Sequence, residues 1–289
     1  MQMRRFGLGR AACAAGICLV LVAVASADWD AGDPHKMDDV FLPDLSAVGM
    51  DVNASWTPAG GGEGRYILFD DFLCAQAGPI TDIHLWGSWL DDAYPDNDPG
   101  NVTFIVSLHN SITGDQESWP DLSNAWVRTF CPGTFTVRPY ATDLEEGWMD
   151  PDGTYIPGAD TVCWQYNFQI DESEAFWQDY DERYWLNVTA IPTVATTWWG
   201  WKTTAVDAEG KGNWARWTYE MSPWDSQHDP GEQQQYLVYP NGHPNGPNPP
   251  DHWWTADGVG FAFVITPEPG TLTLLALGAL AVRRRRRMA

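Results

Sequence analysis

Basic residues are scarce in the body of this chain. The 289 residues carry 39 acidic and 16 basic side chains, a formal net charge of −23. Eight of the basic residues are arginines at the two ends, so the body from Asp28 to Thr266 has 38 acidic and 8 basic residues, a net charge of −30. Such a body repels nucleic acid phosphates and anionic lipid headgroups. We therefore exclude nucleic acid as a partner and expect a monomer.

Cysteine is also rare, with five residues in the chain. Two lie in the N-terminal leader described below, which leaves Cys74, Cys131 and Cys163. No pair of these has the Cys-x-x-Cys spacing of structural zinc sites and thioredoxin-like redox centres. In an exported protein we expect one disulfide among the three, and the sequence does not choose between the three pairings.

Motifs of known catalytic chemistry are missing. The sequence contains no G-x-S-x-G, H-E-x-x-H or phosphate-binding loop, and its six histidines have no metal-ligand spacing. A glycosidase needs two carboxyl groups about 5 to 9.5 Å apart. With 38 acidic residues in the body, some pair meets that condition by chance. The carboxylate criterion therefore does not discriminate, and from the missing motifs we expect no catalytic activity.

The N-terminus has the parts of a secretory signal peptide. Arginines precede the apolar stretch Ala11–Ala25, and Ala25-Ser26-Ala27 is a small-residue cleavage site. We predict that signal peptidase removes residues 1–27 and that the mature chain starts at Asp28. An uncleaved anchor is the alternative, although the apolar stretch is short for a bilayer span.

The C-terminus has three ordered elements in residues 267–289. Pro267-Glu268-Pro269 is followed by the apolar run Thr271–Val282, for which we expect a short helix. A basic cluster comes next, formed by Arg283, Arg284, Arg285, Arg286 and Arg287. A helix of this length reaches about 18 Å, short of a hydrocarbon core of about 30 Å. The arginines favour the cytoplasmic side and stop transfer.

This tail resembles the PEP-CTERM sorting signal. The resemblance implies that an exosortase, a membrane cysteine protease or transpeptidase, cuts near Pro267-Glu268-Pro269. The protein would then be exported, held transiently in the inner membrane, and delivered to the cell surface, the outer envelope or the medium. An ordinary tail anchor is the alternative.

The body has the pattern of an all-β domain, with short alternating apolar runs between Gly, Pro, Asn and Asp clusters. We expect a single antiparallel β-sandwich, jelly-roll-like and with long loops, over residues 66–266, preceded by an irregular segment over residues 28–65. One helix is expected from Ser173 to Tyr180. Strands are predicted at Tyr66–Cys74, Ile80–Leu90, Val102–His109, Ala125–Thr129, Gly133–Arg138, Thr161–Ile170, Tyr184–Ala190, Thr197–Thr203, Ala215–Tyr219 and Gly258–Ile265.

Two passages of the body carry a second resemblance. Residues 69–74 (FDDFLC) and 78–89 (GPITDIHLWGSW) are similar to the core signature of an uncharacterised domain of bacterial secreted PEP-CTERM proteins. Residues 135–140 and 199–203 are similar to later landmarks of that domain. The resemblance implies a domain from about Tyr66 to Ile265 and assigns no site residue.

An aspartate-rich loop follows the strand predicted at Ile80–Leu90. Its oxygen ligands are of the kind that Ca²⁺ prefers, and they come from Asp91, Asp92, Asp96, Asn97 and Asp98. The loop does not follow the EF-hand pattern, so calcium is a candidate cofactor and a solvated turn is the alternative. Asp150, Asp152 and Asp160 form a thinner candidate.

The tryptophans suggest a glycan-stacking face. In the strand at Ile80–Leu90, alternation places Ile83, Leu85 and Trp89 on one face and Asp82, His84 and Trp86 on the other. The same alternation places Trp199 and Trp201 together. We predict that Trp86, Trp199 and Trp201 stack on sugar rings, and the alternative is that they fill the sandwich interior.

These features together predict an exported cell-surface or extracellular-matrix protein without catalytic activity. Its expected partners are signal peptidase, an exosortase and envelope or matrix polysaccharide. The alternative is a secreted carbohydrate-active enzyme or lectin-like carbohydrate-binding module that uses the same three tryptophans.

Overall fold

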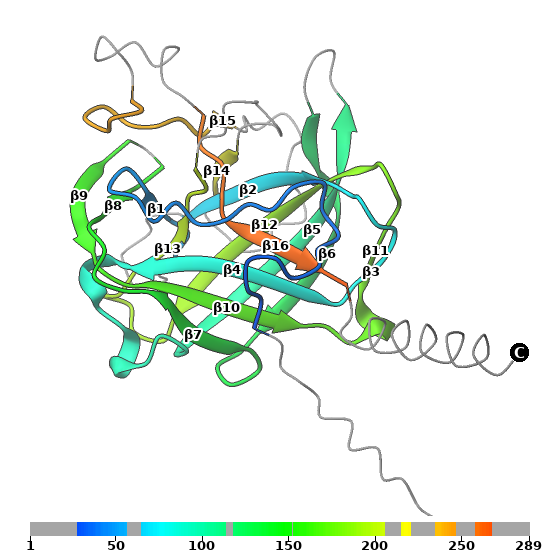
Figure 1. Cartoon of the computed structure of the whole chain (residues 1–289), viewed down its shortest axis with the longest axis horizontal. Coiled ribbons are helices and arrows are strands. Elements are labelled where there is room, and N and C mark those ends of the chain that lie inside the picture. Colours follow the sequence, from blue (N-terminus) through cyan, green and yellow to red (C-terminus); the bar gives the residue numbers. More distant parts are fainter. Residues whose placement is uncertain are drawn as a thin grey trace, which may run out of the picture.

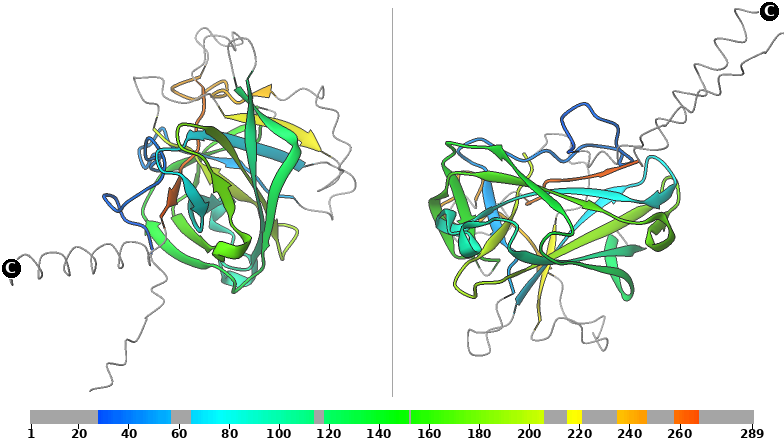
Figure 2. Two further views of the ribbon diagram at one scale, coloured as in Figure 1. Left: turned by 90° about the vertical axis from the view of Figure 1, so that its right-hand side faces the viewer. Right: turned by 90° about the horizontal axis from the view of Figure 1, so that it is seen from below.

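Two large β-sheets pack face to face, with a small two-stranded sheet beside them (Figures 1 and 2). The structure is a computed structural model that describes residues 28–56, 65–113, 118–151, 153–205, 215–220, 235–246 and 258–267. The predicted signal peptide and the predicted C-terminal helix lie outside these residues. Within the described part of the chain, no helix is long and apolar enough to cross a membrane.

The larger sheet has eight strands. In spatial order they are β7 (Thr136–Ala141), β10 (Cys163–Gln169), β4 (Asp82–Trp89), β13 (Trp199–Lys202), β1 (Met50–Asn53), β8 (Glu146–Met149) and β9 (Tyr155–Asp160), with β16 (Phe263–Thr266) also paired to β4. Strands β1 and β8 run parallel, and the other pairs are antiparallel. Strand β4 pairs with β16 along its first half and with β13 along its second half.

The second large sheet has six strands. In spatial order they are β15 (Gln235–Tyr236), β14 (Arg216–Glu220), β2 (Arg65–Leu73), β12 (Arg183–Pro192), β5 (Val102–Thr113) and β6 (Ser118–Phe130). The small sheet pairs β11 (Phe176–Gln178) with β3 (Gly78–Ile80). Within the described residues there are also three 3-10 turns, η1 (Leu90–Asp92), η2 (Pro95–Asn97) and η3 (Glu172–Glu174).

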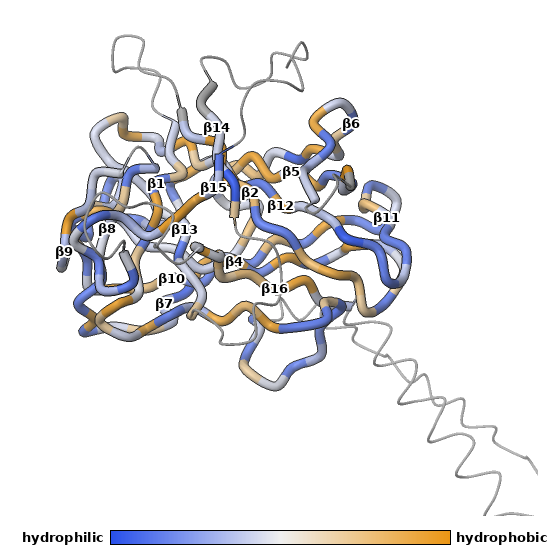
Figure 3. Tube along the Cα trace, turned by 90° about the horizontal axis from the view of Figure 1, so that it is seen from above, coloured by the Kyte–Doolittle hydropathy of each residue, from blue (hydrophilic) through white to orange (hydrophobic). Residues whose placement is uncertain are grey.

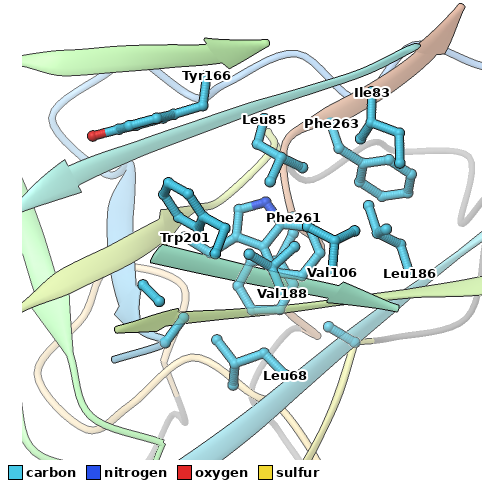
Figure 4. Packing of buried hydrophobic residues seen from close by; sticks show 14 of the residues in the cluster. Leu68, Ile83, Leu85, Val106, Tyr166, Leu186, Val188, Trp201, Phe261 and Phe263 are labelled. Carbon is cyan, nitrogen blue, oxygen red and sulfur yellow. The ribbon is translucent and has the colours of Figure 1, made fainter. Parts of the chain in front are cut away.

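The main core lies between the two large sheets. Alternate residues of β12, Leu186 and Val188 among them, meet Ile83, Leu85 and Phe263 of the opposite sheet, as Figure 4 shows. Hydrophobic positions recur along strands such as β4, β12 and β16 (Figure 3). Burial of these side chains stabilises the sandwich by about 25 cal/mol per Å² of apolar surface.

The outer face of the larger sheet is covered as well. Residues 28–45, the covering segment, run across it (Figure 1, dark blue). Trp29 of this segment packs with Trp86 and Val264 on that face, and Val40 packs against them. Backbone hydrogen bonds of 2.8 Å, from the N–H of Lys36 to the carbonyl of Ile265 and from the N–H of Asp44 to that of Thr203, attach the segment to the sheet. Every residue of β4 is therefore buried, whichever face it points to.

The predicted all-β sandwich is confirmed, and each predicted strand overlaps an observed one. The helix predicted from Ser173 to Tyr180 is wrong. Only a 3-10 turn forms at Glu172–Glu174, because Phe176–Gln178 pairs with β3 and this tertiary pairing overrides local helix propensity. The segment expected to be irregular contains β1, which lies in the middle of the larger sheet.

Candidate functional site

The three tryptophans predicted to stack on sugars are fully buried, so that prediction is wrong. Trp199 and Trp201 do share a face, but it is the core face between the two large sheets. The Trp201 ring stacks on Phe261 with 4.4 Å between the centroids and 8° between the planes (Figure 4). Both therefore fill the sandwich interior.

Trp86 points to the opposite face of the larger sheet, as the alternation predicted, but the covering segment buries it. Its ring packs edge-on against Trp29 at 5.8 Å and against Tyr140 at 5.4 Å. The sequence pattern could separate the two faces of β4, but it could not show that residues far along the chain cover the second one.

The aspartate-rich loop forms the two turns η1 and η2. Both carboxylate oxygens of Asp92 accept hydrogen bonds from Thr161, from its N–H at 3.2 Å and its hydroxyl at 2.7 Å. Oδ1 of Asp98 accepts the N–H of Gly100 at 2.8 Å. Asp91 and Asp96 have left-handed backbone conformations, with φ of 57° and 51°. These contacts give the loop a structural role, and calcium binding there stays a prediction.

The three cysteines of the body are free, so the predicted disulfide is wrong. Cys74 follows β2 and packs into the core between the sheets. Cys163 begins β10 and packs on the outer face of the larger sheet, next to Trp86. Cys131 is exposed. The topology places the three thiols in separate environments, which the sequence spacing could not reveal.

One lysine and three carboxyl groups meet on the outer face of the larger sheet. They form the lysine–carboxylate cluster, with Lys202 from β13, Asp51 from β1, Glu146 from β8 and Asp160 from β9, four neighbouring strands. All four residues are at most 2% exposed. Lys202 Nζ lies 2.6 Å from Oε1 of Glu146 and 3.4 Å from Oδ2 of Asp51. The hydroxyl of Ser88, on β4, donates to Oε2 of Glu146 over 3.1 Å.

Burial sets the protonation of this cluster. It raises the pKa of Asp51 to about 8 and that of Asp160 to about 10. Burial alone would lower the pKa of Lys202, but the neighbouring carboxylates of Asp51 and Glu146 outweigh it and raise that pKa. At neutral pH Asp51 and Asp160 therefore retain protons beside Lys202.

The same carboxyl groups have the spacing of a cation site. One oxygen from each of Asp51, Glu146 and Asp160 lies within 4.8 Å of the others. Oxygen ligands of this kind suit hard divalent cations. However, the Lys202 ammonium contacts two of the three and supplies the positive charge that they require. The arrangement is that of a buried ion pair with an excess of carboxyl groups.

This cluster was not predicted from the sequence, in which only Asp160 was a candidate, for calcium binding, although a signal was present. Lys202 is one of the 8 basic residues of the body, and it alternates with Trp199 and Trp201 along one strand. A lysine in such a strand must lie on the face opposite the tryptophans. What the sequence could not show is that this face is also buried.

A second polar group on the same face is centred on His84. Its Nδ1 lies 2.6 Å from Oδ1 of Asn167, and its Nε2 lies 3.5 Å from Oδ2 of Asp82. Burial lowers the pKa of His84 to about 4 and raises that of Asp82 to about 7. Between these values both side chains are neutral, so the pair stays buried without charge.

Ser107 and His109 form a third buried pair, on the outer face of the six-stranded sheet. The serine hydroxyl lies 2.8 Å from Nε2 of His109 and 3.1 Å from Oδ1 of Asn187. His109 Nδ1 lies 3.0 Å from the carbonyl of Asp121. The distances resemble those of a nucleophile and its base. Ser107 and His109 are only 1% and 4% exposed, so the contacts crosslink strands.

Large aromatic side chains are exposed elsewhere. Trp177 in β11 is 64% exposed, Tyr180 just after that strand is 70% exposed, and Trp198 before β13 is 37% exposed. Trp177 and Tyr180 were not predicted as binding residues, because the sequence pattern placed them in a helix.

The sorting tail begins where the larger sheet ends. Thr266, the last residue of β16, pairs with Asp82 of β4, and Pro267 follows directly. Glu268, Pro269 and the arginine cluster lie outside the described residues. The Pro-Glu-Pro motif therefore starts one residue beyond a strand that is held in the sandwich.

Two family models match the chain. A domain of unknown function, DUF7901, matches residues 36–239, which is more than half of the chain and includes the whole lysine–carboxylate cluster. The PEP-CTERM protein-sorting motif matches residues 266–287. No curated protein and no solved structure matches the chain. The chain thus belongs to the DUF7901 family and carries the C-terminal PEP-CTERM motif of exported proteins that an exosortase sorts.

Proposed function

We propose that the mature protein is a non-catalytic structural component of the cell surface or extracellular matrix. The observation that carries this proposal is the burial of its reactive side chains. In the described residues, Lys202 with its carboxyl partners, the His84–Asp82 pair and the Ser107–His109 pair are all at most 4% exposed. A hydrolase needs such groups at a surface that substrate can reach. In this protein these groups instead form buried contacts between neighbouring strands.

Processing by an exosortase fits this role. A cut near Pro267-Glu268-Pro269 leaves β16 and every other described strand on the exported part. The exported domain would therefore keep its fold when the tail is removed. Intact-mass spectrometry of the protein from each cell compartment tests this step. We expect a surface or medium species that starts at Asp28 and ends near Pro267. A membrane species that retains Arg283–Arg287 would show a simple tail anchor instead.

The absence of catalysis needs its own test. The purified protein is incubated with a panel of bacterial envelope and matrix polysaccharides, and the release of reducing sugar is measured. We expect no release above the buffer control. Release that follows the protein through purification would establish the alternative, a carbohydrate-active enzyme.

Polysaccharide binding is the second candidate, and the exposed aromatics Trp177 and Tyr180 favour it. Exposed aromatic rings are the groups that stack on sugar faces, and water-exposed apolar surface of this size is otherwise unfavourable. Retention on immobilised polysaccharide should fall when Trp177 and Tyr180 are replaced by Ala. Trp198→Ala is the matched control. Equal retention of all variants would remove this candidate.

A further inference from the structure

The lysine–carboxylate cluster brings together the reactants of an amide bond. Three carboxyl groups meet one lysine in a site that is at most 2% exposed. Two uncompensated negative charges there would carry a large desolvation cost. At least one carboxyl group must therefore hold a proton. A carboxylic acid beside an amine, both shielded from water, can condense.

The strand register places Asp51 and Lys202 directly opposite each other. They are Cα partners across the antiparallel pair β1–β13. The backbone bonds Thr203 N–H to Met50 O and Ala54 N–H to Trp199 O fall on alternate pairs, so Asp51 and Lys202 form a non-hydrogen-bonded pair. In such pairs the Cα atoms are about 4.5 Å apart and the side chains are closest. Nζ of Lys202 is already 3.4 Å from Oδ2 of Asp51.

Glu146 is placed to move the proton. Its Oε1 lies 2.6 Å from Nζ of Lys202, and the Ser88 hydroxyl holds its Oε2 at 3.1 Å. The carboxylate therefore faces the amine in a fixed orientation. Asp160 pairs with Glu146 across strands β8 and β9 and adds a further buried carboxyl group.

We propose that Lys202 and Asp51 form an intramolecular isopeptide bond in the folded protein, with Glu146 transferring the proton. Glu146, as a carboxylate, takes one proton from the Lys202 ammonium, and the neutral nitrogen then attacks Cγ of the protonated Asp51. An Nζ–Cγ bond forms, and the Cγ–OH bond of the aspartic acid breaks. The first proton passes from Glu146 to the leaving hydroxyl, and one water departs. Nζ then gives a second proton to Glu146, which ends as a carboxylic acid, so the product is a neutral amide. The step needs no oxidant, reductant or activated co-reactant.

Two physical terms favour this condensation. Reactants fixed in a productive geometry reach effective concentrations of about 10⁵ to 10⁸ M. The buried site also excludes the water that would hydrolyse the amide. The product replaces two buried charged or acidic groups by one neutral amide, which removes part of the desolvation cost of the cluster. It would tie β1 to β13 covalently in a protein whose three body cysteines are free.

Mass spectrometry of the purified full chain or its processed form tests the proposal. We expect a mass 18 Da below that of the sequence between the observed termini. Trypsin should not cut after Lys202, and a branched species should join residues 37–65 to residues 184–211. Fragmentation should place the link between Asp51 and Lys202. The full sequence mass in a folded protein would overturn the proposal, and a link to Glu146 would overturn the assignment of Asp51.

Variants separate the chemistry from the fold. Glu146→Gln should keep the full sequence mass, because the proton-transfer group is gone. Asp51→Asn should lose 17 Da, since the same amide then forms with release of ammonia. Lys36→Arg, which changes another buried lysine, is the matched control and should still lose 18 Da. An 18 Da loss that persists in Lys202→Ala would show that the cross-link is elsewhere and would overturn the proposal.

Discussion

The indole ring of Trp29 stands edge-on against that of Trp86, with 5.8 Å between the centroids and 84° between the planes. Trp29 belongs to the covering segment, and Trp86 lies on the outer face of β4. Their contact explains why a face that the sequence pattern assigns to ligand binding is part of a second hydrophobic cluster, with Cys163, Ala262 and Val264.

Replacing either ring by Ala should destabilise the fold. Trp29 and Trp86 are 2% and 0% exposed, and truncation of a buried tryptophan costs about 3 to 5 kcal/mol. Urea unfolding followed by circular dichroism measures the change. Trp177→Ala, at an exposed tryptophan, should change stability by less than about 0.5 kcal/mol. Unchanged stability of Trp86→Ala together with lost polysaccharide retention would restore the stacking hypothesis.

The Asp82–His84 pair predicts a pH-dependent stability difference. Unfolded Asp82 loses its proton near pH 4, whereas burial keeps the folded residue protonated up to about pH 7. The wild type therefore loses up to about 1.4 kcal/mol per pH unit over this interval, because the folded state retains a proton that the unfolded state has released. Asp82→Asn lacks this loss, so its stability relative to wild type should rise from pH 4 to pH 7 and then level off.

The control for this prediction is internal. His84 loses stability as the pH falls from 6.5 to about 4, since its folded pKa is lowered. That contribution is present in both proteins and cancels in their difference. Unfolding free energies of the wild type and Asp82→Asn at several pH values measure the stability difference. A difference that does not depend on pH would contradict the raised pKa of Asp82.

The cysteines should differ sharply in reactivity. Cys131 is exposed, whereas Cys74 and Cys163 are buried and burial raises the pKa of both thiols. Because the thiolate is the reactive form, we expect iodoacetamide to label one cysteine in the folded mature protein and three after unfolding. Intact mass counts the labels, and Cys131→Ser should remove the native label. Two unreactive thiols in the unfolded, unreduced protein would indicate a disulfide after all.

Asp92 should stabilise the fold without calcium. Its two oxygens accept bonds from Thr161, so Asp92→Ala should cost about 1 kcal/mol in both EDTA and calcium buffer. Thermal unfolding in the two buffers measures this. Asp96→Ala, in the same loop, tests whether calcium binds there. A loss of stability confined to calcium buffer in either variant would show that the loop is a calcium site.

The local features of this protein were predictable from short stretches of its sequence. Alternation along β4 and β13 assigned each side chain to a face, and turn residues bounded strands that the structure confirms. The terminal motifs depend on residue order alone, so the family match at residues 266–287 agrees with the sequence prediction. These features are encoded over a few neighbouring residues.

Which faces of the strands are exposed depends on contacts between segments that are distant in the sequence. The covering segment buries Trp86, and strand pairing turns the expected helix at Ser173–Tyr180 into part of a small sheet. Three segments that are distant in sequence bring the cluster together: β1 carries Asp51, the consecutive strands β8 and β9 carry Glu146 and Asp160, and β13 carries Lys202. Burial and cross-strand distance arise from contacts between distant segments, and these set the protonation of the cluster and its chemistry.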